Sequence, residues 1–143
     1  MIKEAYCSFE LAKLLKEKGF PMNEHLRIYI NKDNLCLTDV GMMSYLSKED
    51  YVHFEDFFIP TITHQMAMAW LREVYNVFIY VEPFITTNGL QGYEPYCTKI
   101  GGEFMWINPF MWINPLRKYS NTSSDTYYEA VEAALRYCLE NLI

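Results

Sequence analysis

Three amphipathic segments, at 9–18, 64–75 and 126–142, limit the folds that this chain can adopt. In each segment apolar residues recur at the spacing of an α-helix, so one face is expected to be buried. The expected N-caps are Ser8, Thr61 or Thr63, and Thr126, the last within the capping box Thr126-x-x-Glu129. The expected C-terminal stops are Gly19 and Asn76. The stripes expected to be buried are Cys7, Leu11, Leu14 and Leu15, then Met66, Ala67, Trp70, Leu71 and Val74, and finally Tyr128, Val131, Leu135, Cys138 and Leu142.

Segments rich in β-forming residues lie between the first two helices. The stretches 26–30 and 35–38 flank the turn-forming segment 31–34, which predicts a hairpin with a four-residue loop. The chain from 41 to 60 is less regular, and we expect a long excursion there with a helical turn near 42–46.

Two further strands are expected between the second and third helices. The run 77–81 is apolar at every position, which is typical of a strand in the middle of a sheet, covered on both faces. Pro83 is expected to close this strand. A loop at 86–92 then leads to a strand at 93–100, where Pro95 indicates an edge or a bulge at the start.

These elements predict an α+β fold in the order α-β-β-α-β-β-α. About four strands would form an antiparallel or mixed sheet, with about three helices packed on it. A chain of 143 residues has the usual length of one domain, so a single α+β domain is expected over 1–143.

Charge and cysteine usage narrow the classes of function and the compartment. The net charge of −6 disfavours nucleic-acid binding, which depends on clustered Lys and Arg. The four cysteines, at 7, 36, 97 and 138, include no C-x-x-C pair, which fits reduced, individually buried thiols. The N-terminus has no long apolar segment, and the longest uncharged stretch, 57–71, is too short to span a bilayer. We expect a soluble, intracellular protein that binds neither nucleic acid nor membrane.

The hexapeptide Phe-Met-Trp-Ile-Asn-Pro occurs twice in succession at 104–115. Each Asn-Pro opposes a helix, so two short extended pieces hinged at Asn108-Pro109 are expected. In one account the copy enlarges a loop whose aromatic side chains pack against the domain. In the other the aromatic side chains form an exposed ladder that binds a partner or a second copy of the chain. The ladder consists of Phe104, Trp106, Phe110 and Trp112.

Three segments carry a resemblance to known proteins. They read Cys-Ser-Phe-Glu-Leu-Ala-Lys-Leu-Leu at 7–15, Thr-His-Gln-Met-Ala-Met-Ala-Trp-Leu-Arg-Glu-Val at 63–74, and Tyr-Tyr-Glu-Ala-Val-Glu-Ala-Ala-Leu-Arg-Tyr-Cys-Leu-Glu-Asn-Leu-Ile at 127–143. With the strands between them, these segments resemble small uncharacterised phage and prophage proteins of gut Bacteroidales, and the phage ABA-sandwich domain. The resemblance covers 7–15 and 60–143 and implies a sheet between helices. Its motifs are packing patterns, so it implies no active-site residue.

Candidate catalytic and metal-binding residues are few. His53, Glu55 and His64 are the only grouped metal or acid–base side chains, and His53-x-Glu55 is similar to the motif of zinc deaminases. That chemistry also requires a P-C-x-x-C motif, which this chain lacks. No Cys is recognisably paired with a His for nucleophilic catalysis. We therefore expect no catalytic residues, no metal and no cofactor, and interpret the protein as a non-enzyme.

With the resemblance, the leading hypothesis is a non-catalytic phage- or prophage-encoded protein that acts in the cytoplasm of a bacterial host cell by protein–protein interaction. Its partner would be a host or viral protein, or a second copy of the chain in a homo-oligomer. The alternative is a protein that binds or sequesters a small molecule of the nucleotide type, with Arg72, Arg117 and Lys118 as possible phosphate contacts. A small metal-dependent hydrolase that uses His53, Glu55 and His64 is a third hypothesis.

Overall fold

The computed structural model describes residues 5–21, 27–29, 38–39, 59–101, 112–116 and 123–143. The chain divides into two compact units, 1–63 and 64–143. Three helices and antiparallel strands occur in the described residues, so the predicted α+β class is confirmed. The described strands form two sheets, of three strands and of two, instead of the single sheet of about four strands that we expected. The single domain stays a prediction.

The first unit contains helix α1, which spans Phe9–Glu17. Ser8 caps it as predicted, because its Oγ accepts a hydrogen bond from the Leu11 N–H at 3.2 Å. After the helix, Gly19 takes a φ of +86°, the left-handed conformation that glycine adopts at little cost. The start and the end of this helix are therefore confirmed. Its buried residues are Leu11, Ala12 and Leu15.

Three short strands of the first unit form an antiparallel sheet in the order β2-β1-β3. They are β1 (Arg27–Tyr29), β2 (Thr38–Asp39) and β3 (Ile59–Thr61). β1 pairs antiparallel with β2, with Arg27 opposite Asp39 and Ile28 opposite Thr38, and the predicted hairpin with a four-residue loop stays a prediction. The predicted loop 31–34 and the predicted turn near 42–46 lie outside the described residues.

The side chain of Thr61 does not cap the second helix, as one of our two alternatives proposed. Its Oγ1 donates a hydrogen bond to the Cys7 carbonyl oxygen at 2.9 Å, and the Cys7 N–H donates to the Ile62 carbonyl oxygen at 2.8 Å. Thr61 is buried, and its hydrogen bond links β3 to the segment before α1.

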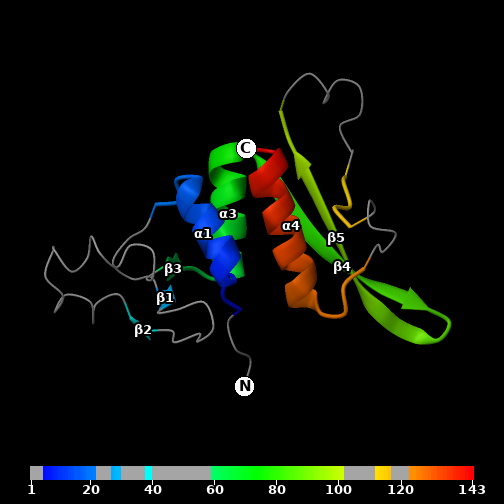
Figure 1. Cartoon of the computed structure of the whole chain (residues 1–143). Helices are drawn as coiled ribbons and strands as arrows, with labels where there is room; N and C mark the ends of the chain where they lie inside the picture. The colour runs from blue at the N-terminus through cyan, green and yellow to red at the C-terminus, as the bar shows by residue number, and fades with distance from the viewer. Residues whose placement is uncertain (1–4, 22–26, 30–37, 40–58, 102–111, 117–122) are drawn as a thin grey trace, which may run out of the picture. The chain divides into compact units, whose positions relative to one another are not determined.

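The second unit contains helices α3 (His64–Tyr75) and α4 (Tyr127–Asn141). The predicted capping box at the start of α4 is present, with both Thr126 and Glu129 making their reciprocal hydrogen bonds. Asn76 ends α3 as predicted, with a φ of 54°. In Figure 1 the two helices lie beside the long hairpin of strands β4 (Val77–Thr86) and β5 (Gly89–Lys99).

The buried stripes of α3 and α4 differ from the sequence-based ones. Met66, Val74 and Tyr128 are exposed, and Trp70 and Leu142 are only half-buried. The buried residues of the two helices are His64, Ala67 and Leu71 in α3, and Ala130, Val131, Ala134, Leu135, Cys138 and Leu139 in α4.

The prediction of a central strand at 77–81 is wrong. β4 pairs with β5 alone among the described strands, and only Val77 of the run is buried. The strand also continues through Pro83 to Thr86, and the expected loop is instead a two-residue turn at Thr87 and Asn88. The hydrophobic run indicated a strand correctly, but apolar composition alone does not show how many faces are covered.

Both prolines of the hairpin occupy positions that need no N–H for the strand pairing. The N–H groups of Tyr93 and Cys97 donate to the Ser124 and Ile113 carbonyl oxygens, away from β4. Pro95 lies between them on the same side, so the edge predicted for it is confirmed. Pro83 lies opposite Tyr93, whose own N–H points away from β4. At such a pair the backbone nitrogen of β4 also points away from β5, so Pro83 costs no hydrogen bond to β5. The register shift between β4 and β5 lies between Phe84 and Ile85, so the bulge that was the other alternative for Pro95 does not occur there.

The hairpin has one face toward helix α4 and one outer face. Val77, Pro95 and Cys97 belong to the helix-facing side and are buried. Because side chains alternate along a strand, Tyr80 and its partner Tyr96 belong to the outer face. The far end of the hairpin runs past the start of α4 (Figure 1).

Candidate functional site

An aromatic cluster occupies the outer face of the hairpin. Tyr80 and Tyr96 are directly paired across the strands, and their rings stack with centroids 5.0 Å apart and planes 13° apart. Trp112 meets Tyr80 edge-on at 4.8 Å. Tyr80 is 38% exposed and Trp112 is 39% exposed, so part of each ring is available to a ligand or partner. We call Tyr80, Tyr96 and Trp112 the aromatic cluster.

Two carboxylates adjoin the aromatic cluster on the same face. Glu82 and Glu94 are directly paired across the strands, two residues from Tyr80 and Tyr96 respectively. Glu94 Oε2 accepts a hydrogen bond from the Tyr96 hydroxyl at 2.8 Å. Like charges in directly opposed positions repel each other. We call Glu82 and Glu94 the glutamate pair.

Burial, together with the neighbouring glutamate pair, raises the pKa values of Tyr80 and Tyr96. Burial, the hydrogen bond to Glu94 and the charges of Glu94 and Glu82 together raise the pKa of Tyr96 to about 12. Burial is also the largest cause that raises the pKa of Tyr80, followed by the charges of Glu82 and Glu94. Both shifts arise because a phenolate is disfavoured near carboxylates and away from water.

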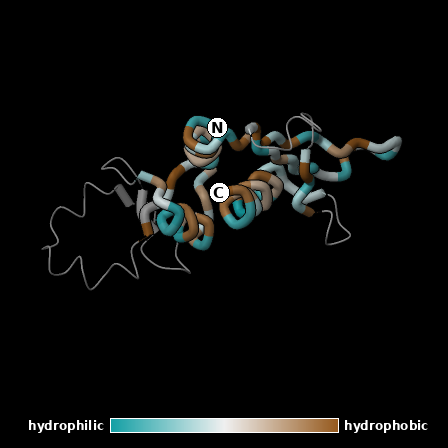
Figure 2. Tube along the Cα trace, turned by 90° about the horizontal axis from the view of Figure 1, so that it is seen from above, coloured by the Kyte–Doolittle hydropathy of each residue, from teal (hydrophilic) through white to brown (hydrophobic). Residues whose placement is uncertain are grey.

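The far end of the hairpin carries exposed apolar side chains. Phe84 is 38% exposed, Ile85 is 64% and Leu90 is 55%. Ile85 and Leu90 are paired across the strands. Figure 2 shows brown, apolar stretches along the hairpin as far as its polar tip. We call Phe84, Ile85 and Leu90 the arm patch.

Trp112 is the one member of the predicted aromatic ladder that lies in the described residues; Phe104, Trp106 and Phe110 lie outside them. The segment after it is anchored to β5, since Ile113 and Cys97 exchange two backbone hydrogen bonds of 2.8 and 2.9 Å. Asn114 Oδ1 accepts from the Leu116 N–H at 2.9 Å, which forms a turn over Pro115. Residues 112–116 therefore form an extended piece followed by an Asn-Pro turn. Trp112 packs against Tyr80 and is partly exposed. It therefore agrees in part with the packed loop and in part with the exposed ladder, the two alternatives that the sequence left open.

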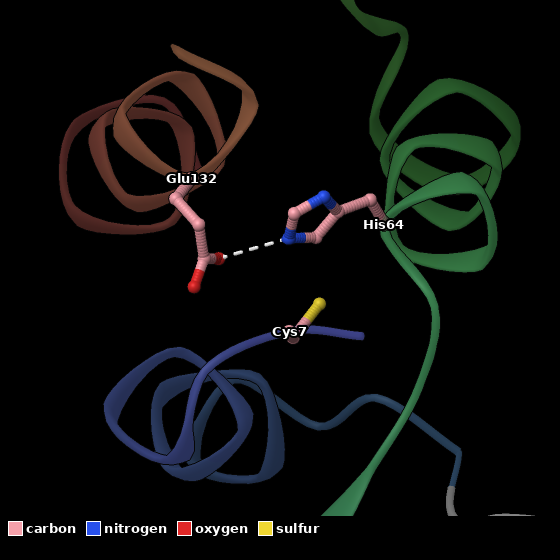
Figure 3. A group of neighbouring side chains, drawn as sticks. All are labelled: Cys7, His64 and Glu132. Carbon is pink, nitrogen blue, oxygen red and sulfur yellow. Dashed lines mark ion pairs between the residues drawn. The ribbon is translucent and has the colours of Figure 1, made fainter. Parts of the chain in front are cut away.

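His64 is brought close to an acidic residue that the sequence did not single out. Its Nε2 lies 3.3 Å from Glu132 Oε2 of helix α4 (Figure 3). The two atoms are close enough for an ion pair, although neither atom nor His64 Nδ1 has the geometry of a hydrogen bond. The His64 side chain is buried and that of Glu132 is partly exposed.

The pair joins α3 to α4, and by itself it offers two ligand atoms, whereas a structural zinc site takes four. His53 and Glu55 lie outside the described residues. A metal-binding role for His53, Glu55 and His64 therefore stays a prediction.

Of the possible phosphate contacts, only Arg72 lies in the described residues. It is exposed on α3, and its Nε is 3.1 Å from Glu73 Oε1, an acceptor that competes with a phosphate for the guanidinium. Arg117 and Lys118 lie outside the described residues. Nucleotide binding through these three residues therefore stays a hypothesis.

The described cysteines Cys7, Cys97 and Cys138 are free and buried, as the sequence predicts. Cys97 and Cys138 are not isolated from each other, because a hydrogen bond with Cys97 is the largest cause that raises the pKa of the Cys138 thiol, followed by burial. The raised pKa makes the Cys138 thiol a weak nucleophile, and both cysteines are fully buried and pack as core residues. Cys36 lies outside the described residues.

No helix among the described residues is long and apolar enough to cross a membrane. Comparison with family models, with curated proteins and with solved structures finds no match for this chain.

Sequence reasoning missed the glutamate pair, the two cross-strand partners of the aromatic cluster and the arm patch. The signal that could have found them is Asn88-Gly89, the strongest short-range sign of a tight hairpin. With that turn, Tyr80 falls near Tyr96 and Glu82 near Glu94. Because Pro83 was interpreted as the end of its strand, the pairing of 80 with 96 and of 82 with 94 was not predicted.

Proposed function

We propose that this protein is a non-catalytic binding protein that acts by protein–protein interaction through the β4–β5 hairpin. The observation that carries the proposal is the arm patch, in which Phe84, Ile85 and Leu90 are exposed together at the end of a two-stranded ribbon. The resemblance to phage and prophage proteins makes a host or viral protein the expected partner, with a second copy of the chain as the simplest alternative.

The energetics of the hairpin support this function. Every residue from 82 to 91 is exposed, so the far half of the ribbon depends on its own cross-strand contacts. A two-stranded hairpin alone is marginally stable in water. Burial of apolar surface contributes roughly 25 cal/mol per Å², so a partner that covers the arm patch would gain affinity and order the hairpin.

Substitution of the arm patch tests the proposal. The variant Phe84→Ser, Ile85→Ser, Leu90→Ser should lose the protein's oligomers in light scattering, or lose a cross-linked partner from producing cells. Exposed apolar residues near the base of the unit, Val74 and Ile100, provide the matched control V74S/I100S. Both variants should unfold at temperatures close to that of the parent.

Three outcomes separate the alternatives. Loss of oligomers in the arm variant alone identifies a second copy as the partner, and loss of a cross-linked partner alone identifies a different protein. Unchanged mass and unchanged cross-linking in the arm variant would contradict the proposal. The variant W106A/W112A tests in the same assays whether the tandem hexapeptide belongs to this surface.

A further inference from the structure

We infer that the outer face of the β4–β5 ribbon recognises an arginine side chain of an extended segment in the partner protein, held by the aromatic cluster and the glutamate pair. The inference rests on the proposed function and adds the chemistry of the partner. It uses the aromatic cluster and the glutamate pair, none of whose residues belongs to the arm patch.

The glutamate pair lacks a cation within the described part of the chain. Glu82 is exposed and Glu94 half-buried, and the only polar contact of the pair among the described residues is the hydrogen bond from the Tyr96 hydroxyl to Glu94. Two carboxylates in directly opposed positions destabilise the ribbon unless a positive charge lies between or above them. A bound cation would relieve this repulsion, so charge complementarity specifies a positive occupant.

The aromatic cluster specifies the same kind of occupant by a separate mechanism. Tyr80 and Trp112 meet edge-on, and each exposes more than a third of its surface. A cation over the face of such a ring is attracted by the ring quadrupole, most strongly for tryptophan. Rings and carboxylates lie on one face of the ribbon within two residues of each other along each strand.

Arginine fits this surface better than lysine. A guanidinium is planar, stacks on aromatic rings and can donate two hydrogen bonds to a carboxylate at the same time, whereas an ammonium is a compact, strongly hydrated charge. The net charge of −6 also disfavours a second copy of this chain as the source of the cation and favours a basic partner.

The occupant belongs to an extended segment because the site lies on the outer face of an exposed ribbon. Tyr80 and Glu82 are two residues apart on β4, as are Glu94 and Tyr96 on β5, so aromatic and acidic contacts follow each other along the strand direction. An extended segment that runs along the ribbon can place one arginine over the rings and carboxylates and continue toward the arm patch.

Fluorescence anisotropy with labelled peptides tests the inference. The probe is a peptide of alternating glycine and arginine, compared with peptides in which lysine or glutamine replaces every arginine. The variant E82Q/E94Q should bind the arginine peptide about tenfold or more weakly than the parent, because both charges are lost while the new amide oxygen at position 94 can still accept from Tyr96. The matched control E17Q/E140Q removes the same charge from exposed positions on α1 and α4 and should bind within about twofold of the parent.

The aromatic contribution has its own readout. Trp112→Leu should weaken binding of the arginine peptide more than binding of the lysine peptide, and Trp112→Phe should preserve most of the preference. Circular dichroism verifies that each variant is folded. If E82Q/E94Q fails to fold, the single variant E82Q takes its place.

Failure of the inference is distinguishable from failure of the proposed function. Equal losses for E82Q/E94Q and E17Q/E140Q would show that only overall charge attracts the peptide and would overturn the inference, as would equal binding of the arginine and glutamine peptides. The arm-patch experiment would be unaffected by either result. A normal arm-patch result with a failed glutamate test leaves a binding protein with a partner of another chemistry.

Discussion

At the scale of the residue, the pairing register of β4 and β5 places two glutamates opposite each other and next to two tyrosines. Neither Glu82 nor Glu94 is unusual in the sequence, and each becomes significant because the other faces it across the ribbon. The same pairing places Tyr96 where a carboxylate accepts from its hydroxyl group. The effect of the glutamates can therefore be measured through the pKa of Tyr96.

Ionisation of Tyr96 reports on this environment. We expect Tyr96 to ionise near its raised pKa of about 12, and the substitution Glu94→Gln to lower that pKa toward 10.0. Because the folded-state pKa lies above the unfolded value, the contribution to stability is complete below pH 10.0 and is lost as the pH rises to about 12. Ultraviolet absorbance of the phenolate, as the difference between the parent and Tyr96→Phe, measures the shift. An unchanged midpoint in the Glu94→Gln protein would contradict the assignment.

Gly92 is a second residue whose role comes from its surroundings. A Cβ atom at this position would lie 2.7 Å from the Ser124 carbonyl oxygen, a backbone atom that is hydrogen-bonded to Tyr93. Gly92→Ala should therefore destabilise the protein by about 1–3 kcal/mol through overpacking. Chemical denaturation measures the change, and the exposed neighbour substitution Gln91→Ala should have a much smaller effect.

At the scale of the element, local signals predicted helix ends better than buried faces. Ser8, Gly19, Asn76 and Thr126 act at the helix termini as the sequence indicates, since caps depend on residues three or four positions away. Burial depends on what packs against the helix. Tyr128 is exposed although it falls on the apolar stripe of α4, and Ala134 is buried although its side chain is small.

Helix α4 provides a direct test of its buried face. Leu135 is fully buried, so Leu135→Ala should cost about 2–5 kcal/mol of unfolding free energy. Tyr128 is 50% exposed, and Tyr128→Ala should cost clearly less in the same denaturant titration. Similar losses for the two variants would show that the stripe read from the sequence was correct after all.

The N-cap of α4 contributes separately from the core. Thr126→Ala removes the acceptor of the Glu129 N–H and should cost about 1 kcal/mol. Thr126→Ser retains the hydroxyl group and should restore most of the loss. Both values come from the same denaturation experiment, and equal stability of the alanine and serine variants would contradict a capping role.

At the scale of the whole molecule, the net charge sets the repulsion between copies of the chain. The net charge is −6 at pH 7, and the sequence pI is about 5.0. We expect turbidity to be greatest near pH 5.0, where the net charge vanishes and repulsion between molecules is lost. The arm variant Phe84→Ser, Ile85→Ser, Leu90→Ser should remain clearer at this pH than the parent. Equal turbidity of the two proteins would exclude the arm patch as the adhesive surface.

The amino-acid sequence alone determined the α+β class, the bounds of three helices and the presence of strands on either side of residue 88. These features follow from local chemistry, namely periodicity, caps and turn residues. Only the tertiary structure decided that β4 and β5 form a two-stranded ribbon, that α4 covers one face of it, and that two glutamates and three aromatic rings share the other. Pairing joins residues far apart in the chain, and its register moves a side chain from one face to the other with a shift of a single residue.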